Sequence, residues 1–119
     1  MVEKAILYQN FLKLSYAIEE LTQFPKLSPD ERELLNKLNS FWIKSEFLKV
    51  IDSVNLIEDS SASSTFKRLK NLRKKGYVDI VIDENDNRVK YVHPSQQTND
   101  YFATLGSFIL ESVKSFKGS

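Results

Sequence analysis

The chain has 119 residues, of which 41% are hydrophobic and 28% charged, the balance of one soluble globular domain. It contains no cysteine, which excludes disulfide bonds and thiolate metal sites. Because no apolar run reaches the length of a signal-peptide core or a transmembrane helix, we expect a cytoplasmic protein without a membrane partner.

The first predicted helix covers residues 3–23 and ends at Phe24-Pro25. Its apolar residues recur at spacings of four and three, which is the a/d pattern of helices that pack along one stripe. These residues are Leu7, Phe11, Leu14, Ile18 and Leu21. Either the core of the domain or a second subunit is needed to cover this stripe.

A second helix is predicted to begin after Ser28, because this residue suits an N-cap and Pro29 follows it at the first helical position. Two acidic residues then lie near the positive end of the helix dipole. A third helix is expected from about Ser45, followed by a connection over residues 52–59. The side chains of the second helix expected to face the core are Leu34, Leu35, Leu38, Phe41 and Trp42, and the apolar positions of the third are Phe47, Leu48, Val50 and Ile51.

Residues 60–75 form the most informative predicted helix, with hydroxyl residues at its start and Gly76 directly after its end. This stretch holds six basic residues and no acidic one, so it carries +6, and the rest of the chain carries −5 within the total of +1. A solvated helix face usually mixes both signs, whereas a basic stripe on a mildly acidic body favours a polyanionic partner. The expected core face consists of Ala62, Phe66, Leu69 and Leu72.

From Tyr77 the apolar period changes to two, which predicts a strand rich in β-branched residues. Residues 84–87 form a turn sequence, and residues 88–92 resume the alternation until Pro94 ends it. These features together predict a β-hairpin.

A final helix is predicted from Ser95 to residue 117. The order is therefore helix, helix, helix, basic helix, hairpin, helix, and a short helix before a basic helix and a hairpin defines a winged helix-turn-helix. We expect a mainly α fold with a small β-hairpin in a single domain, residues 1–119. Its winged helix-turn-helix core spans residues 28–93, and its long terminal helices span residues 1–24 and 95–117. The stripe of the final helix is Phe102, Leu105, Ile109 and Phe116, with Phe108 and Val113 beside it.

The stretch Ser64–Val78, STFKRLKNLRKKGYV, resembles the multiple-antibiotic-resistance regulator (MarR) family of bacterial winged-helix transcription factors. The matching pattern is Ser-Thr, an apolar and a basic residue, a leucine ladder, and charged residues before glycine and an aliphatic strand. The turn Asp83–Arg88 resembles the family's wing, and Tyr101-Phe102 to Gly106 is similar to the last helix of short members. The resemblance covers roughly residues 28–110. Asn87 departs from it, because the family usually has two adjacent arginines here, and the connection from Ile51 to Ser60 is longer than usual.

The resemblance implies a homodimer whose first and last helices intertwine and which presents two basic helices to successive major grooves of double-stranded DNA. The heptad-like spacing of the terminal helices favours the same dimer. The wing arginine, Arg88, is then expected to reach the minor groove or its phosphates. The dimer-interface residues predicted in this way are Leu7, Phe11, Leu14, Ile18, Phe102, Leu105, Ile109 and Phe116.

The predicted DNA-binding residues divide by role, since base contacts specify a sequence and phosphate contacts position the protein. Ser63, Ser64, Lys67 and Arg68 are expected to face base edges at the start of the helix. Backbone contacts are expected from Ser60, Ser61, Lys70, Asn71 and Lys74, with Arg88 and Lys90 acting from the wing. The predicted function is a sequence-specific transcriptional regulator that acts as a repressor by occluding a promoter.

Other chemistry is not supported by the sequence. His93 is the single histidine and has no cysteine or acidic partner at metal-ligand spacing, so we expect no metal, no cofactor, no catalytic residue and no enzyme. The aromatic residues could line a pocket for a small-molecule effector, although core and dimer packing account for them more simply. The alternative function is a winged-helix module that binds another protein through its basic helix or hairpin and has no DNA operator.

Overall fold

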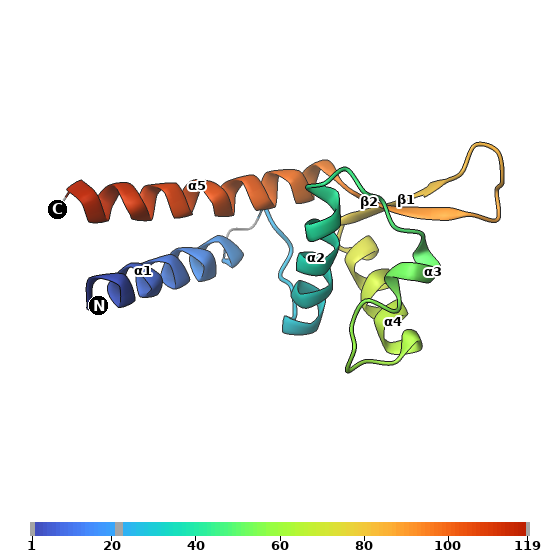
Figure 1. The fold of residues 1–119 in the computed structure, drawn as a ribbon, viewed down its shortest axis with the longest axis horizontal. Helices are drawn as coiled ribbons and strands as arrows, with labels where there is room; N and C mark the ends of the chain where they lie inside the picture. The colour runs from blue at the N-terminus through green and yellow to red at the C-terminus, as the bar shows by residue number, and fades with distance from the viewer. Residues whose placement is uncertain (1, 21–22, 119) are drawn as a thin grey trace. The chain divides into compact units, whose positions relative to one another are not determined.

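The structure is a computed structural model that describes residues 2–20 and 23–118, apart from the side chains of residues 18–19 and 115–118 (Figure 1). In chain order the elements are α1 (Val2–Glu19), α2 (Pro29–Trp42), α3 (Val50–Ser53), α4 (Ala62–Lys74), β1 (Val78–Ile82), β2 (Lys90–Pro94) and α5 (Gln96–Gly118). The chain divides into two compact units. The unit Leu27–Thr98 contains α2 to β2, and the other unit contains α1 and most of α5. The mainly helical fold with one antiparallel hairpin confirms the predicted fold class.

Helix α2 begins as the sequence predicts and forms the centre of the core of its unit. Ser28 is the N-cap: its Oγ accepts from the backbone N–H of Glu31 at 3.1 Å, and its own N–H donates to Glu31 Oε1 at 2.9 Å. This reciprocal capping box satisfies two backbone donors that the helix itself leaves unpaired. Leu34, Leu35 and Leu38 are completely buried, which confirms the predicted core face.

Glu31 also joins α2 to the end of α4. Its side chain is only 7% exposed, and Lys75 Nζ donates to Glu31 Oε1 at 2.5 Å. Burial alone would raise the pKa of this carboxyl. The hydrogen bond from Lys75, the backbone donor of Ser28 and the positive charge of Lys75 outweigh burial, so the pKa of Glu31 lies below its ordinary value. The carboxylate therefore stays ionised inside the unit and holds two helices together.

The predicted helix start near Ser45 is wrong, because Ser45 belongs to the turn that terminates α2 after Trp42. Its φ of +59° is left-handed, and both hydrogen bonds of a Schellman motif are present: Ser45 N–H to Trp42 O at 2.9 Å and Glu46 N–H to Phe41 O at 3.0 Å. Residues 46–48 have no regular secondary structure, Lys49 is extended, and helix α3 begins only at Val50. Of the apolar positions expected here, Phe47 is 41% exposed and Ile51 is 70% exposed, whereas Leu48 and Val50 are half-buried.

The residues before α3 pair with the hairpin. Val92 N–H donates to Leu48 O at 2.9 Å, and Lys49 forms a bridge with Tyr91 of β2. Backbone donors and acceptors that a helix would have satisfied internally are satisfied instead by a strand more than forty residues later in the chain. Local sequence carries no sign of that partner, which is why the helix was predicted to begin too early.

Helix α4 begins and ends close to the predicted bounds but is rotated about its axis. Its buried residues are Thr65, Leu69 and Leu72, whereas the predicted core residues Ala62 and Phe66 are exposed, Phe66 by 42%. Thr65 can be buried because its hydroxyl donates to Ser60 Oγ at 3.2 Å. After the helix, Gly76 adopts φ +84°, the left-handed conformation that glycine adopts without strain.

Strands β1 and β2 form the predicted hairpin, but β2 lies two residues later than expected. Val78 is opposite Pro94 and Ile82 is opposite Lys90, so Pro94 closes the ladder as its last residue instead of following it. The turn is longer because Asp83 holds it: its Oδ1 accepts from the backbone N–H of Asn85 at 2.8 Å and of Asp86 at 3.1 Å. Arg88 consequently belongs to the turn.

The unit of α1 and α5 is described separately. Helix α1 ends at Glu19, four residues before its predicted end; Glu20 lies in a turn, and Leu21 falls outside the described residues. Phe24 is buried and meets Tyr101 of α5 edge to face, with ring centroids 5.5 Å apart. The side chains of two predicted interface residues, Ile18 and Phe116, also lie outside the part described.

Candidate nucleic-acid interface

The buried face of α4 determines which of its residues point outward. Successive residues of a helix are rotated by 100°, so the side of α4 opposite to Thr65, Leu69 and Leu72 can be worked out. That side carries a row of four residues, spaced by four, three and four positions. All four members of this row are exposed, and we name the row the outer stripe. It consists of Ser63, Lys67, Lys70 and Lys74. The sequence predicted all four as DNA-binding residues, and the fold brings them together on one surface.

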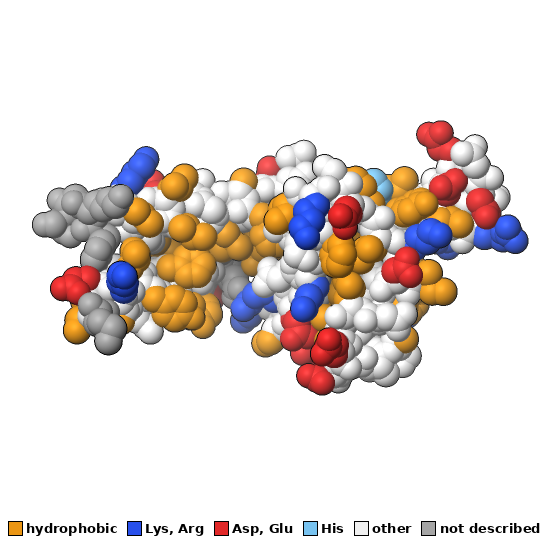
Figure 2. All heavy atoms as spheres, in the orientation of Figure 1, with side chains coloured by type: hydrophobic (Ala, Val, Ile, Leu, Met, Phe, Trp, Pro, Cys, Tyr) orange, Lys and Arg blue, Asp and Glu red, His pale blue; other side chains and the backbone are white. Residues whose placement is uncertain are grey.

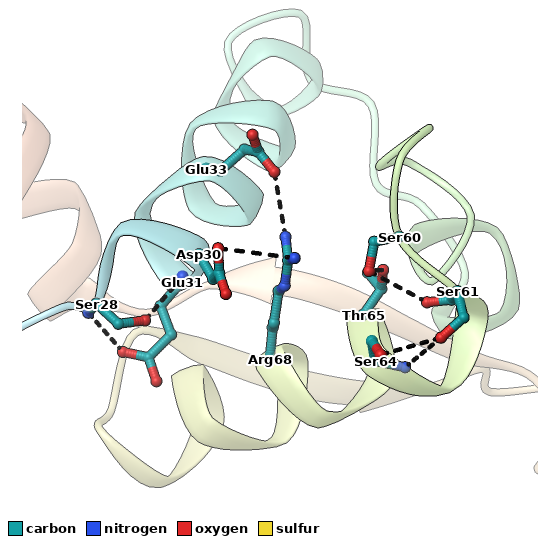
Figure 3. A network of polar contacts seen from close by, with 9 residues as sticks. All are labelled: Ser28, Asp30, Glu31, Glu33, Ser60, Ser61, Ser64, Thr65 and Arg68. Atoms are coloured by element: carbon teal, nitrogen blue, oxygen red, sulfur yellow. Dashed lines mark hydrogen bonds and ion pairs between the residues drawn. The ribbon is translucent and has the colours of Figure 1, made fainter.

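The hydroxyl residues before the stripe are mainly occupied with capping the helix (Figure 3). Ser61 is the N-cap: its Oγ accepts from the backbone N–H of Ser64 at 3.1 Å and donates to Ser64 Oγ at 3.0 Å. Ser60 Oγ accepts from the buried hydroxyl of Thr65. Of the predicted serines, Ser63 is therefore the one that lies on the outer stripe, although its Oγ is 3.3 Å from Ser61 Oγ. The others stabilise the first turn.

Arg68 points away from the outer stripe toward α2 (Figure 3). Its Nη1 donates to Glu33 Oε1 at 3.1 Å, its Nη2 lies 3.7 Å from Asp30 Oδ1, and its side chain is only 18% exposed. The predicted base contact of Arg68 stays a prediction, and it requires the guanidinium to leave two carboxylates. Asn71 is half-buried on the same flank, where Asp59 also lies. This flank of α4 is acidic around Arg68.

The wing presents Arg88 in a fixed orientation. Its guanidinium is bidentate on Asp86, with Nε donating to Oδ1 at 3.0 Å and Nη2 to Oδ2 at 3.2 Å, and its side chain is 89% exposed. These hydrogen bonds lower the pKa of Asp86, so this carboxylate remains charged. Lys90, the first residue of β2, is also exposed. Figure 2 shows the mixture of acidic and basic side chains at this end of the hairpin.

A groove lies between α3, α4 and the wing, and sequence reasoning missed it. We call it the wing groove; its cavity has a volume of about 680 Å³. Its apolar lining includes Val50, Ile51, Val54, Phe66 and Val89, and its basic lining consists of Lys49, Arg88 and Lys90. The available signal was that Thr65, Leu69 and Leu72 repeat at spacings of four and three, which is a second helical stripe beside the one containing Phe66. That alternative leaves Phe66 on the surface.

The terminal helices expose more apolar surface than the predicted interface residues account for. Leu7, Phe11, Leu14, Phe102 and Leu105 are half-buried, and Ile109 is 44% exposed. Figure 2 shows hydrophobic side chains gathered on the visible face of this unit. The exposed ones, which the a/d spacing did not select, include Ile6, Tyr8, Tyr16 and Leu110.

His93 has a packing role, since its ring stacks on Phe47 with centroids 4.1 Å apart and planes 7° from parallel. Within residues 2–20 and 23–118, no group of three or more histidine, aspartate or glutamate side chains is placed to hold a metal ion. In the same part of the chain, none of the helices combines the length and apolar character needed to span a bilayer.

Comparison with solved structures supports the fold. The chain is similar to the heme sensor protein PefR from Streptococcus agalactiae in complex with heme, at 22% identity and TM-score 0.57 over 96% of this chain and 76% of that one. It is also similar to Bordetella bronchiseptica BpsR, whose DNA binding is regulated by 6-hydroxynicotinic acid, at 13% identity and TM-score 0.53 over 98% and 84%. The adhesin competence repressor AdcR from Streptococcus pyogenes gives 17% identity and TM-score 0.51 over 98% and 79%.

No protein-family model and no curated protein matches the sequence. The fold is that of a winged helix-turn-helix protein with long terminal helices. More particularly, it is a MarR-like winged-helix fold, as the residues of α4 and the wing predicted.

Proposed function

We propose that this protein is a sequence-specific regulator of transcription that binds double-stranded DNA. The observation that carries the proposal is the outer stripe: Ser63, Lys67, Lys70 and Lys74 are exposed side by side on α4, in a unit whose wing adds Arg88 and Lys90. A helix of this kind fits the major groove, where its first residues meet base edges. The fold that it shares with regulators such as AdcR supports the same reading.

The exposures of the side chains suggest how the contacts are divided. Ser63 and Lys67 are the outermost residues of the first two turns and are proposed to read base edges, with Ser64 and Arg68 beside them. Phosphate contacts are proposed for the residues farther along α4 or around its N-cap and for the wing. These are Ser60, Ser61, Lys70, Asn71, Lys74, Arg88 and Lys90.

We further propose that the regulator is a homodimer formed through α1 and α5, and that it represses by occupying a promoter. The support is the exposed apolar side chains on these helices, including Ile6, Tyr8 and Leu110, because apolar side chains exposed together favour association with another protein surface. A twofold dimer would carry two α4 helices and would therefore read an inverted repeat. A small-molecule effector is part of the proposal, since PefR and BpsR are described with heme and 6-hydroxynicotinic acid respectively.

The test is selection from a randomised duplex library with the full chain, at moderate salt, followed by sequencing of the retained DNA. The expected result is an inverted repeat with half-sites about one helical turn apart, bound by two chains as measured by sedimentation of the complex. A single half-site bound by one chain would contradict the dimer but keep the DNA-binding function. No enrichment together with no salt-sensitive binding would contradict the function and favour the protein-interaction module.

Salt dependence gives the test a matched control. Replacing Lys74 by Ala is expected to weaken binding to all duplexes. The negative slope of log K against log salt should become shallower by about 1, because one phosphate contact is lost. Lys37, an exposed lysine on α2, is the control, and Lys37→Ala should leave the slope unchanged. Equal slopes for parent and Lys74→Ala would remove Lys74 from the interface.

A further inference from the structure

The exposed ring of Phe66 is unusual for a residue in the second turn of α4. It is 42% exposed, although Leu69 and Leu72 of the same helix are buried, and it lines the wing groove beside Ala62 and Ser63. A phenylalanine side chain is normally buried in the core, where it contributes strongly to stability. Here it lies at the end of α4 that is proposed to meet base edges.

The neighbours of Phe66 extend the apolar surface. Ile51 of α3 is 70% exposed, and Val54, which follows α3, is half-buried; both line the same groove. The surface is therefore continuous between two helices of one compact unit and does not depend on the terminal helices.

The charge of the groove identifies the kind of occupant. Lys49, Arg88 and Lys90 belong to its lining, with Arg88 paired to Asp86, and none of the described lining residues is acidic. Lys70 Nζ lies 5.2 Å from the centroid of the Phe66 ring. An occupant that complements this lining carries negative charge close to an apolar group. Duplex DNA has that combination in its major groove, where the C5-methyl group of thymine lies between two phosphate backbones.

We infer that Phe66 reads thymine through its C5-methyl group, with Ala62 and Ile51 completing the apolar contact. This inference rests on the proposed function, because it assigns a specificity to the same helix, on the side that faces the wing groove. Lysine and serine side chains recognise hydrogen-bonding groups on base edges, whereas only an apolar side chain gains from burying a methyl group. Phe66 thus adds a recognition element that the polar outer stripe lacks.

The experiment uses the inverted repeat obtained by selection, synthesised with deoxyuridine in place of each thymidine in turn. Deoxyuridine keeps every hydrogen-bonding group of thymidine and lacks only the methyl. The parent protein is expected to lose about three- to tenfold in affinity at one or two positions in each half-site, the range expected for burial of one methyl group. Those positions should also be invariant thymines in the selected sequences.

The variant Phe66→Ala should bind the thymidine and deoxyuridine duplexes equally, while Phe66→Leu, which keeps an apolar side chain, should retain part of the difference. Ile43→Ala is the matched control, because Ile43 is 74% exposed at the far end of α2 and its truncation should leave discrimination intact. The comparison within the parent protein needs no variant, so a folding defect in Phe66→Ala cannot conceal the result.

The outcomes separate this inference from the proposed function. Specific binding by the parent without any difference between thymidine and deoxyuridine would overturn the role of Phe66 and leave the regulator intact. Full discrimination by Phe66→Ala would assign the methyl contact to another residue and overturn the inference too. Absence of any specific DNA binding would overturn both.

Discussion

The ion pair between Glu31 and Lys75 supports a quantitative prediction about stability. Glu31 Oε1 lies 2.5 Å from Lys75 Nζ, and the two side chains are 7% and 33% exposed. The pair joins the first turn of α2 to the residue that ends α4, so it fixes the helix that carries the outer stripe. Lys75→Met removes the charge and keeps an unbranched apolar side chain of similar length.

We expect this replacement to lower the free energy of unfolding at neutral pH by about 1–3 kcal/mol, because hydrogen bonds to charged groups contribute about 1.5–3 kcal/mol. Breaking a fully buried pair costs about 3–5 kcal/mol, but the partial exposure of Lys75 keeps the loss below that range. The N–H of Ser28 remains as a donor to Glu31, which reduces the loss further.

The pH dependence provides the sharper part of the prediction. In the parent, the pKa of Glu31 is lowered by folding, so its contribution to stability is present above the ordinary value of 4.5 and is lost as the pH falls through the folded-state pKa. Without Lys75, burial becomes the main influence and raises the pKa of Glu31, so protonation then favours the folded state. The stability difference between parent and variant should shrink as the pH falls from about 7 to about 4.

The assay is urea unfolding of parent and Lys75→Met at both pH values, with Lys74→Met as control. Lys74 is the preceding residue and is exposed, so its replacement should change stability by less than about 0.5 kcal/mol. A penalty for Lys75→Met that is equally large at both pH values would refute the assigned coupling to Glu31.

Two further changes test the end of α2 and the role of Arg68. Ser45→Gly should raise the free energy of unfolding by about 0.5–1 kcal/mol, because glycine adopts the φ of +59° without strain, whereas Ser40→Gly within α2 should lower it by about 1 kcal/mol. Thermal unfolding measures both, and destabilisation by Ser45→Gly would contradict the helix-stop assignment. Arg68→Ala should cost at most about 1 kcal/mol of stability, because its partners Glu33 and Asp30 are largely exposed. If Arg68 also contacts a base, specific DNA affinity should fall by roughly 1–3 kcal/mol, and unchanged affinity in fluorescence anisotropy would rule that contact out.

The sequence by itself determined the features that depend on neighbouring residues. The cap at Ser28, the leucines of α2 and the alternation of β1 are short-range signals, because caps, helical stripes and pleats are set within one or two turns of chain. The same holds for Lys67 and Lys74 of the outer stripe. Their exposure follows from helical spacing together with the cost of burying a charge.

Tertiary structure decided what depends on partners far along the chain. Leu48 lies outside a helix, where its carbonyl accepts from Val92 of β2, and Arg68 points toward α2, where Glu33 accepts its hydrogen bond. The rotation of α4 follows from the burial of Thr65 beside Ser60, which leaves Phe66 in the wing groove. The sequence offers two stripes of α4 that share Leu69 and Leu72, and packing against α2 and β1 selected the stripe with Thr65 over the one with Phe66.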